Sequence, residues 1–216
     1  MVRRLTPGER ADITDGAGTV AECVVAAARP AELVLTVLSV RSEARPEPQL
    51  AVLQAIPKGE RGDLAVELLT EVGADVIVPW AADRCVAVWR GDRAVKGAAR
   101  WRSAAVQAAK QSRRAWFPEV PDQADRAAAV QRVQEAALAI VLDPDSNLAL
   151  AAADLPAAGE ILLIVGPEGG ISPAEDEAFR AAGAVGARLG PTVLRASSAG
   201  VVATGIVLSR TARWAE

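Results

Sequence analysis

The chain of 216 residues contains no histidine. This absence excludes Ser-His-Asp and Cys-His nucleophilic catalysis and the His-Glu-x-x-His zinc hydrolases, because each of these needs an imidazole. Any catalysis by this protein must therefore depend on other side chains. Group transfer that relies on positioning and charge, with little acid–base work, is compatible with such a composition.

Cysteine is nearly absent as well, and long apolar runs do not occur. Cys23 and Cys85 are far apart in sequence, so they offer neither a disulfide framework nor a C-x-x-C zinc motif, and we interpret both as small buried hydrophobic residues. No metal site is predicted. No apolar run approaches the roughly 18 residues of a membrane helix, and the N-terminal MVRRLTPGER lacks the apolar core of a signal peptide. We therefore expect a cytoplasmic protein that does not bind membranes.

Positive charge is concentrated in one segment of an otherwise acidic chain. The net charge is −3, yet residues 90–114 carry eight basic side chains and one acidic one, which leaves 16 basic and 26 acidic side chains elsewhere. On a helix, Gln107, Lys110, Gln111 and Arg114 would share one face. Such a stripe can hold RNA phosphates while an aromatic ring, of Trp101 or Trp116, or a guanidinium plane stacks on a base. The alternative, a solvated helix face that serves solubility, stays open at this point.

Two sequence patterns divide the chain. Residues 1–46 indicate β-structure, with strands at 11–13, 19–27 and 33–40. From Leu50 onward strands and helices alternate, and 51% of all residues are hydrophobic, which predicts a parallel sheet with helices on both faces. The expected elements are strand 50–56, helix 60–72, strand 75–79, a hairpin through 84–90, helices 98–113 and 123–136, and strand 138–142.

The segment 161–179, ILLIVGPEGGISPAEDEAF, is the most informative in the chain. An apolar strand breaks at Gly-Pro, a Glu-Gly-Gly loop follows, and a helix over 173–182 starts with the capping box of Ser172 and Glu175. A glycine-rich loop between a strand and a helix is typical of phosphate sites. Here the loop and the first helical turn are already acidic, so a neutral or cationic ligand is favoured.

The same pattern recurs at 188–195, RLGPTVLR, before an apolar helix from Ala199 to about Arg210 that Ser197 or Ser198 is expected to cap. Strands joined through a helix should run parallel, which places both Gly-Pro turns at the carboxyl edge of one sheet. Open α/β sheets bind ligands in the crevice outside that edge. The sequence therefore predicts a ligand crevice made jointly by the two loops.

LLIVGPEGGISPAEDEAF followed by RLGPTVLRASSAG is similar to the RsmE-type ribosomal RNA uridine N3-methyltransferases, a family of S-adenosylmethionine-dependent enzymes in the SPOUT class. The similarity continues through AIPKGERGDLAVELLTEVGAD and RWRSAAVQAAKQSRRAWFPEV. The beginning, VRRLTPGERADITDGAG, resembles the later part of the family's PUA-like β-barrel. The family motif R-T-E-T-A has Ser197 in place of its glutamate here, so no role of that carboxylate is carried over.

The resemblance implies an α/β fold, a parallel sheet with a C-terminal trefoil knot, preceded by a small partial PUA-like β-barrel. The expected domains are 1–46 for the barrel and 47–216 for the methyltransferase. It further implies a homodimer that uses S-adenosylmethionine to methylate N3 of a uridine in small-subunit (16S) ribosomal RNA, with that RNA or the small ribosomal subunit as partner.

The resemblance also implies site residues. We expect Arg195 or Arg114 to be catalytic, as a cation that stabilises the negative charge on the imide oxygens of the uracil. The expected substrate-binding residues are Lys58, Gln111, Arg113 and Arg114. The expected cofactor-binding residues are Leu142, Val165, Gly166, Pro167, Glu168, Gly169, Gly170, Leu189, Gly190, Leu194, Arg195 and Ser197.

Three other functions are possible in principle for such a chain. A nucleotide-dependent oxidoreductase would need G-x-G-x-x-G early in the fold, and GPEGG lies late and lacks that spacing, so this class is excluded. A catalytically silent RNA-binding protein and a relative that modifies a different RNA or base remain as alternatives.

Overall fold

The computed structural model describes residues 5–59, 61–87 and 89–215. The chain divides into two compact units, which are described separately. The smaller unit comprises the chain up to Arg45 together with Arg113–Phe117, and the larger unit comprises Pro46–Ser112 and the chain from Pro118 onward. The first four residues, at the start of the segment that resembles a barrel, lie outside the described residues.

The smaller unit is a three-stranded antiparallel sheet in the order β1-β2-β3. Its strands are β1 (Arg10–Thr14), β2 (Thr19–Arg29) and β3 (Glu32–Ser42). The Asp15 side chain closes the β1–β2 turn because its Oδ1 accepts hydrogen bonds from the backbone N–H groups of Ala17 (2.7 Å) and Thr19 (3.0 Å). These bonds to the carboxylate hold the pKa of Asp15 below its usual value.

Residues 113–117 belong to this sheet because they pair with the β1–β2 turn. The Gly18 N–H donates to the Ala115 carbonyl (3.1 Å), and the Phe117 N–H donates to the Gly16 carbonyl (2.9 Å). Gly18 has φ +97°, and a Cβ there would lie 2.7 Å from the Trp116 ring, so only glycine fits. The Trp116 indole N–H in turn donates to the Glu43 carbonyl (3.0 Å), which fixes this ring within its own unit.

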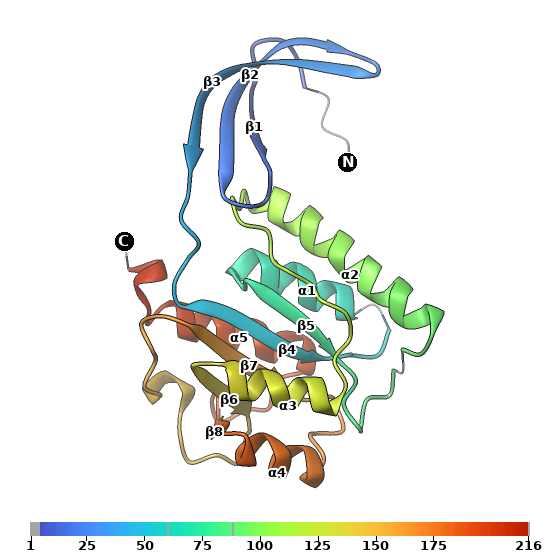
Figure 1. Ribbon diagram of the computed structural model, residues 1–216, viewed down its shortest axis with the longest axis vertical. Helices are drawn as coiled ribbons and strands as arrows, with labels where there is room; N and C mark the ends of the chain where they lie inside the picture. The colour runs from blue at the N-terminus through green and yellow to red at the C-terminus, as the bar shows by residue number, and fades with distance from the viewer. Residues whose placement is uncertain (1–4, 60, 88, 216) are drawn as a thin grey trace. The chain divides into compact units, whose positions relative to one another are not determined.

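The larger unit contains a five-stranded sheet in the order β5-β4-β7-β6-β8, and every neighbouring pair is parallel (Figure 1). Its strands are β4 (Gln49–Ala55), β5 (Val76–Trp80), β6 (Leu138–Leu142), β7 (Glu160–Val165) and β8 (Val185–Ala187). The central strands are almost wholly apolar and buried, as expected of a parallel sheet covered on both faces. The predicted α/β class with a parallel sheet is confirmed.

Helices cover the two faces of this sheet. Alternate residues of β4 point to opposite sides: Leu50 and Val52 belong to one core cluster, and Ala51 and Leu53 belong to the other. The first cluster packs against α1 (Arg61–Val72), α2 (Asp92–Gln111) and α5 (Ala196–Leu208). The second packs against α3 (Arg126–Glu135) and α4 (Pro173–Ala181). Short 3-10 helices lie at Leu150–Ala152 (η1) and Ala212–Trp214 (η2). Within the described ranges, none of the helices has the length and apolar character needed to cross a bilayer.

The hairpin predicted through 84–90 is wrong. The described residues between β5 and α2 form turns and irregular chain, without a strand; Val88 lies outside them. The Asp83 N–H donates to a carboxylate oxygen of Glu175 (2.7 Å), and the Cys85 N–H donates to the Ala82 carbonyl (3.0 Å). Because turn and side-chain bonds occupy these donors, the segment does not pair as a hairpin.

Two helix boundaries also differ from expectation. The basic helix starts at Asp92, six residues before the predicted 98, and ends at Gln111. Arg113 then adopts φ +57°, so Arg114 lies beyond the helix and cannot share a helical face with Gln107 and Lys110. Helix α5 starts at Ala196, with Arg195 as its N-cap residue and no side-chain cap. Ser197 and Ser198 therefore lie inside its first turn, and the prediction that one of them caps the helix is wrong.

Candidate functional site

A cavity of about 760 Å³ lies at the carboxyl ends of β6 and β7. Three segments line it: the chain after β6, the Gly-Pro loop after β7, and the second Gly-Pro segment between β8 and α5. Because β6, β7 and β8 run parallel, their carboxyl ends meet at one edge of the sheet. The two loops thus form one crevice, as the sequence predicted.

The loop after β7 ends in a tight turn. The Gly170 N–H donates to the Pro167 carbonyl (2.9 Å), so Glu168 and Gly169 occupy the tip. Gly170 has φ +74°, a left-handed conformation that favours glycine. Pro167 is buried while Glu168 is exposed. The turn therefore presents a carboxylate at its tip on a fixed backbone.

Arg84, from the chain after β5, contacts this turn. Its guanidinium Nη1 donates to the Gly169 carbonyl (3.2 Å). A Cβ on Gly169 would lie 3.2 Å from the Arg84 Cβ and 3.3 Å from the Arg84 carbonyl oxygen. Glycine at 169 thus allows the loop and the segment around Arg84 to approach closely, and the contact holds the loop in place.

The start of α4 is fixed by the predicted capping box. Ser172 Oγ accepts from the Glu175 N–H (3.3 Å), and Glu175 Oε2 accepts from the Ser172 N–H (2.9 Å). Glu175 is fully buried, and its other oxygen accepts from the Asp83 N–H (2.7 Å). The Asp83 carboxylate accepts from Ser172 Oγ (2.8 Å) and pairs with Arg126. These two interactions, the Ser172 bond first, lower the pKa of Asp83.

Gln54 holds the second Gly-Pro segment against the sheet. This buried side chain, near the end of β4, donates from Nε2 to the carbonyl of Ala196 (3.3 Å), the first residue of α5. Nε2 also lies 3.0 Å from the carbonyl oxygen of Ala55. Sequence reasoning missed Gln54, although an amide inside the otherwise apolar run LAVLQA of β4 was a visible signal.

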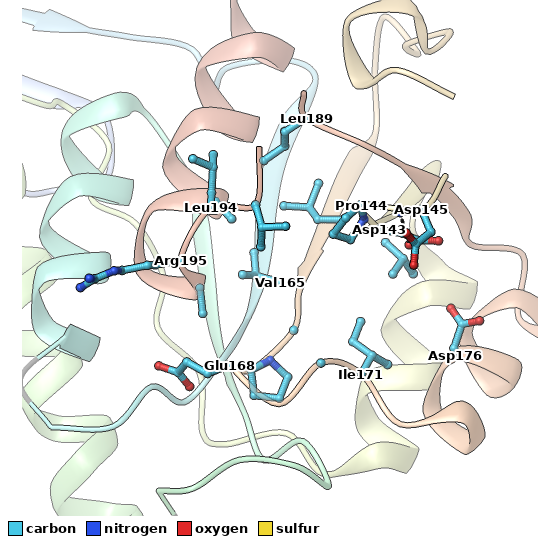
Figure 2. Close-up of a pocket in the computed structure, with 18 of the residues that line it drawn as sticks. Asp143, Pro144, Asp145, Val165, Glu168, Ile171, Asp176, Leu189, Leu194 and Arg195 are labelled. Carbon is cyan, nitrogen blue, oxygen red and sulfur yellow. Dashed lines mark hydrogen bonds between the residues drawn. The ribbon is translucent and has the colours of Figure 1, made fainter. Parts of the chain in front are cut away.

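Charge is unevenly distributed around the cavity. Four carboxylates and two guanidiniums line it: Asp143, Asp145, Glu168, Asp176, Arg84 and Arg195. Figure 2 shows Glu168 and Arg195 on one side and the three aspartates on the other. Arg180 links two of these aspartates, from its Nε to Asp176 (2.7 Å) and from its Nη2 to Asp143 (3.2 Å). In the described ranges, no group of three or more His, Cys, Asp or Glu side chains is arranged to hold a metal ion.

Most residues predicted to bind a cofactor line this cavity. Those that do are Leu142, Val165, Gly166, Pro167, Glu168, Gly170, Leu189, Gly190, Leu194 and Arg195. Gly169 and Ser197 do not line it, and their roles stay predictions. Thr192 and Val193 also line it, inside the predicted loop 188–195, whereas sequence reasoning missed the contributions of Arg84, Asp143, Pro144, Asp145, Ile171 and Asp176. The strand end at Asp143-Pro144 was the signal for the two aspartates there, and Ile171 and Asp176 lie within the segment 161–179.

The residues predicted to bind substrate lie elsewhere. Lys58 lines a separate open cleft, together with Arg61, Asp63, Glu67 and Arg100 among others. Gln111 is exposed at the last residue of α2. Arg113 and Arg114 belong to the smaller unit, and the Arg114 Nε donates to the Trp116 carbonyl (2.9 Å). None of the four lines the cavity beside Arg195, and their roles stay predictions.

Trp101 cannot stack on a base. It is only 1% exposed, in the core cluster between the sheet and α1, α2 and α5, where it meets Trp89 edge-to-face at 5.3 Å. The prediction that this ring could stack on a base is wrong, because Trp101 lies on the buried, apolar side of α2.

Comparisons with known proteins extend this description. Residues 45–208 match the model of the RNA methyltransferase domain. The ribosomal RNA small subunit methyltransferase E of Mycobacterium tuberculosis is 46% identical to this chain over 217 residues, covering 99% of this chain and 83% of the relative. The chain belongs to the RNA methyltransferase family.

Solved structures place the family fold on most of this chain. A Legionella pneumophila protein, solved in complex with the cofactor S-adenosylmethionine, superimposes with a TM-score of 0.83 at 25% identity over 96% of this chain and 86% of that protein. The ribosomal RNA small subunit methyltransferase E of Neisseria gonorrhoeae, bound to S-adenosylmethionine, gives a TM-score of 0.83 at 24% identity with the same coverage. The resemblance read from the two Gly-Pro motifs is thereby confirmed at the level of the methyltransferase E family.

Proposed function

We propose that this RNA methyltransferase uses S-adenosylmethionine to methylate N3 of a specific uridine in small-subunit (16S) ribosomal RNA. One observation carries the proposal: the two Gly-Pro loops jointly form a single cavity at the sheet edge of a chain that is 46% identical to a methyltransferase E. The donor would supply a methyl group bound to positively charged sulfur.

The residues of the cavity suit this donor. Its volume of about 760 Å³ lies within the range of about 300–1,000 Å³ typical of small-molecule sites. Apolar side chains, among them Leu142, Leu189 and Leu194, can hold an adenine ring. Four carboxylates against three guanidiniums, with Arg180 behind two of the aspartates included, leave a net negative charge that favours a ligand with a cationic centre, which agrees with the acidic loop read from the sequence.

The side chains can also serve the reaction. Removing the N3 proton of uracil leaves negative charge on the imide oxygens, and Arg195, which lines the cavity with no ion pair in the described residues, would stabilise it. Arg114 is the second candidate for this role. Lys58, Gln111 and Arg113 would bind the base or its phosphates. Pairing of guanidinium with phosphate oxygens would make RNA binding sensitive to salt.

The architecture of the family completes the proposal. We assign residues 1–46 to a partial PUA-like β-barrel and 47–216 to a SPOUT methyltransferase domain whose C-terminal part forms a trefoil knot. The active enzyme would be a homodimer in the cytoplasm. Size-exclusion chromatography with light scattering tests the dimer.

The deciding experiment incubates the protein with labelled donor and either small ribosomal subunits or naked RNA, and maps the modified nucleotide. Label on N3 of one uridine supports the proposal. Label at another base or in another RNA favours the related enzyme with a different target. RNA binding without donor binding or methyl transfer favours the catalytically silent RNA-binding protein.

A further inference from the structure

The reaction proposed above requires a base, and the chain has no histidine to act as one. An imide N–H is a weak acid, so its proton must leave before or during attack on the methyl carbon. A positioned carboxylate can take such a proton as a general base. The candidates are therefore the carboxylates that line the donor cavity.

Two of the four cavity carboxylates already form ion pairs with an arginine. Asp143 and Asp176 both pair with Arg180, at 3.2 and 2.7 Å. Glu168 and Asp145 have no ion pair within the described parts of the chain. A carboxylate without a bound cation keeps its lone pairs available for an incoming proton, which leaves these two.

The position of each carboxylate in the cavity favours Glu168 over Asp145 as the base. Figure 2 shows Glu168 on the same side as Arg195, the cation assigned above to the developing imide charge, and Asp145 on the opposite side. Glu168 is also at the tip of the 167–170 turn, exposed, on a backbone held by the Gly170 to Pro167 hydrogen bond and by Arg84. A base must be held close to the acid that it serves, and this turn provides such a position.

We propose that Glu168 is the general base of the reaction, a catalytic role that deepens the function proposed above and rests on it. The Glu168 carboxylate accepts the N3 proton, and the N3 electron pair forms a bond to the methyl carbon. The carbon–sulfur bond breaks with its electrons going to sulfur, which becomes a neutral thioether. The proton then passes from Glu168 to water, so one proton is released for each methyl group transferred.

The groups around Glu168 are compatible with this role. Arg195 and Arg84 line the same cavity as Glu168. Burial raises the pKa of the nearby Cys85 thiol, and the negative charges of Glu168 and Glu175 raise it further. Cys85 is therefore a neutral thiol near neutral pH and does not compete as the base.

The test is the pH dependence of methyl transfer by the full-length protein with saturating donor and small subunits. With a carboxylate as base, the rate is nearly independent of pH between about 6 and 8, because carboxylates in general are ionised throughout this range. In Glu168→Gln, only imide ionised by solvent can react, so the rate at pH 7 falls by about 10²–10⁴-fold. The remaining rate then rises about tenfold per pH unit, because it follows the concentration of imide anion.

Two variants serve as controls. Glu177→Gln removes an exposed carboxylate of α4 outside the cavity lining and is expected to keep both rate and pH profile. Asp145→Asn removes the rival carboxylate and is expected to keep the flat profile. Donor affinity is measured for each variant by calorimetry, so that the donor concentration can be kept saturating for every variant and a weaker affinity does not lower the measured rate.

The outcomes separate this inference from the proposed function. A wild-type protein that places no methyl group on N3 overturns the proposed function and the inference together. Methylation at N3 with an unchanged profile in Glu168→Gln, or with the steep profile in Asp145→Asn instead, overturns the inference alone. A steep profile confined to Glu168→Gln supports it.

Discussion

The buried carboxylate of Glu175 should be the main support of the loop that forms one wall of the cavity. It is fully buried, and its two oxygens accept hydrogen bonds from two backbone N–H groups: Asp83 at 2.7 Å and Ser172 at 2.9 Å. The first bond ties the chain after β5 to α4, and the second closes the capping box. Replacing Glu175 with alanine removes both bonds and leaves two donors to find other partners.

The magnitude follows from the kind of bond that is lost. A hydrogen bond to a charged group contributes about 1.5–3 kcal/mol, so the loss of two predicts a decrease of about 3 kcal/mol or more in the free energy of unfolding. For a domain of about 150–250 residues, this corresponds to a decrease in Tm of roughly 6–12 °C. Glu177→Ala, an exposed position of the same helix, should change stability by less than about 0.5 kcal/mol.

Urea unfolding followed by circular dichroism measures the free energy of unfolding of both variants, and a thermal scan with and without the donor measures the change in Tm. The donor-induced increase in Tm should shrink in Glu175→Ala and persist in Glu177→Ala, because the loop that lines the cavity loses its anchor in the first variant alone. Equal stability of the two variants, within about 0.5 kcal/mol, would refute the reasoning, since it would mean that the capping-box carboxylate has no net effect on folding.

Further predictions concern stability, pH and binding. A ligand that binds only the folded state at about 100 times its Kd stabilises by about 2.7 kcal/mol, so S-adenosylmethionine should raise the Tm in a thermal scan; an unchanged Tm would argue against the donor site. Gly18→Ala should destabilise the smaller unit by more than about 1 kcal/mol in urea unfolding, because a Cβ there meets the Trp116 ring at 2.7 Å and φ is +97°. Burial raises the pKa of Glu160 despite its ion pair with Arg132. The folded protein therefore holds this proton to a higher pH than the unfolded chain does, and the free energy of unfolding decreases as the pH rises from the ordinary pKa of a glutamate to the raised one. That decrease should be missing in Glu160→Gln, and a pH dependence identical to the parent would contradict it. RNA affinity should fall with salt by about 0.7 log units per log unit of salt for each phosphate contacted, and an affinity indifferent to salt would remove the basic segment from RNA binding.

Local signals in the sequence are sufficient to predict the two loops. A capping box, a proline at the first helical position and a glycine-proline break act within a few residues, and the predicted start of α4 coincides with the observed one. Parallel strand direction then follows from the crossover connection, which places both loops at one edge of the sheet. Ten of the residues expected at a cofactor site line the cavity for this reason.

Long-range contacts are what the sequence could not reveal. Arg84 and Asp83 come from a segment with no local pattern, and they reach the cavity loops only because α4 and the chain after β5 meet in space. The end of α2 was also misplaced, because helix propensity cannot show that Arg113 turns into the left-handed region before residues 113–117 pair with the β1–β2 turn. Tertiary pairing determined both features.

The structure also explains why a glycine-rich loop before a helix is not a phosphate site here. Anion sites at helix N-termini depend on free backbone N–H groups and on uncompensated positive dipole charge. In α4 the N–H groups of Ser172 and Glu175 are both bound within the capping box, and Glu175 adds a buried negative charge at the same end. The carboxylates of Asp83 and Asp176 compensate the helix end further. With its donors occupied and its charge reversed, this helix end repels phosphate, and the Gly-Pro loop above it is left to bind a ligand whose reactive centre is positive.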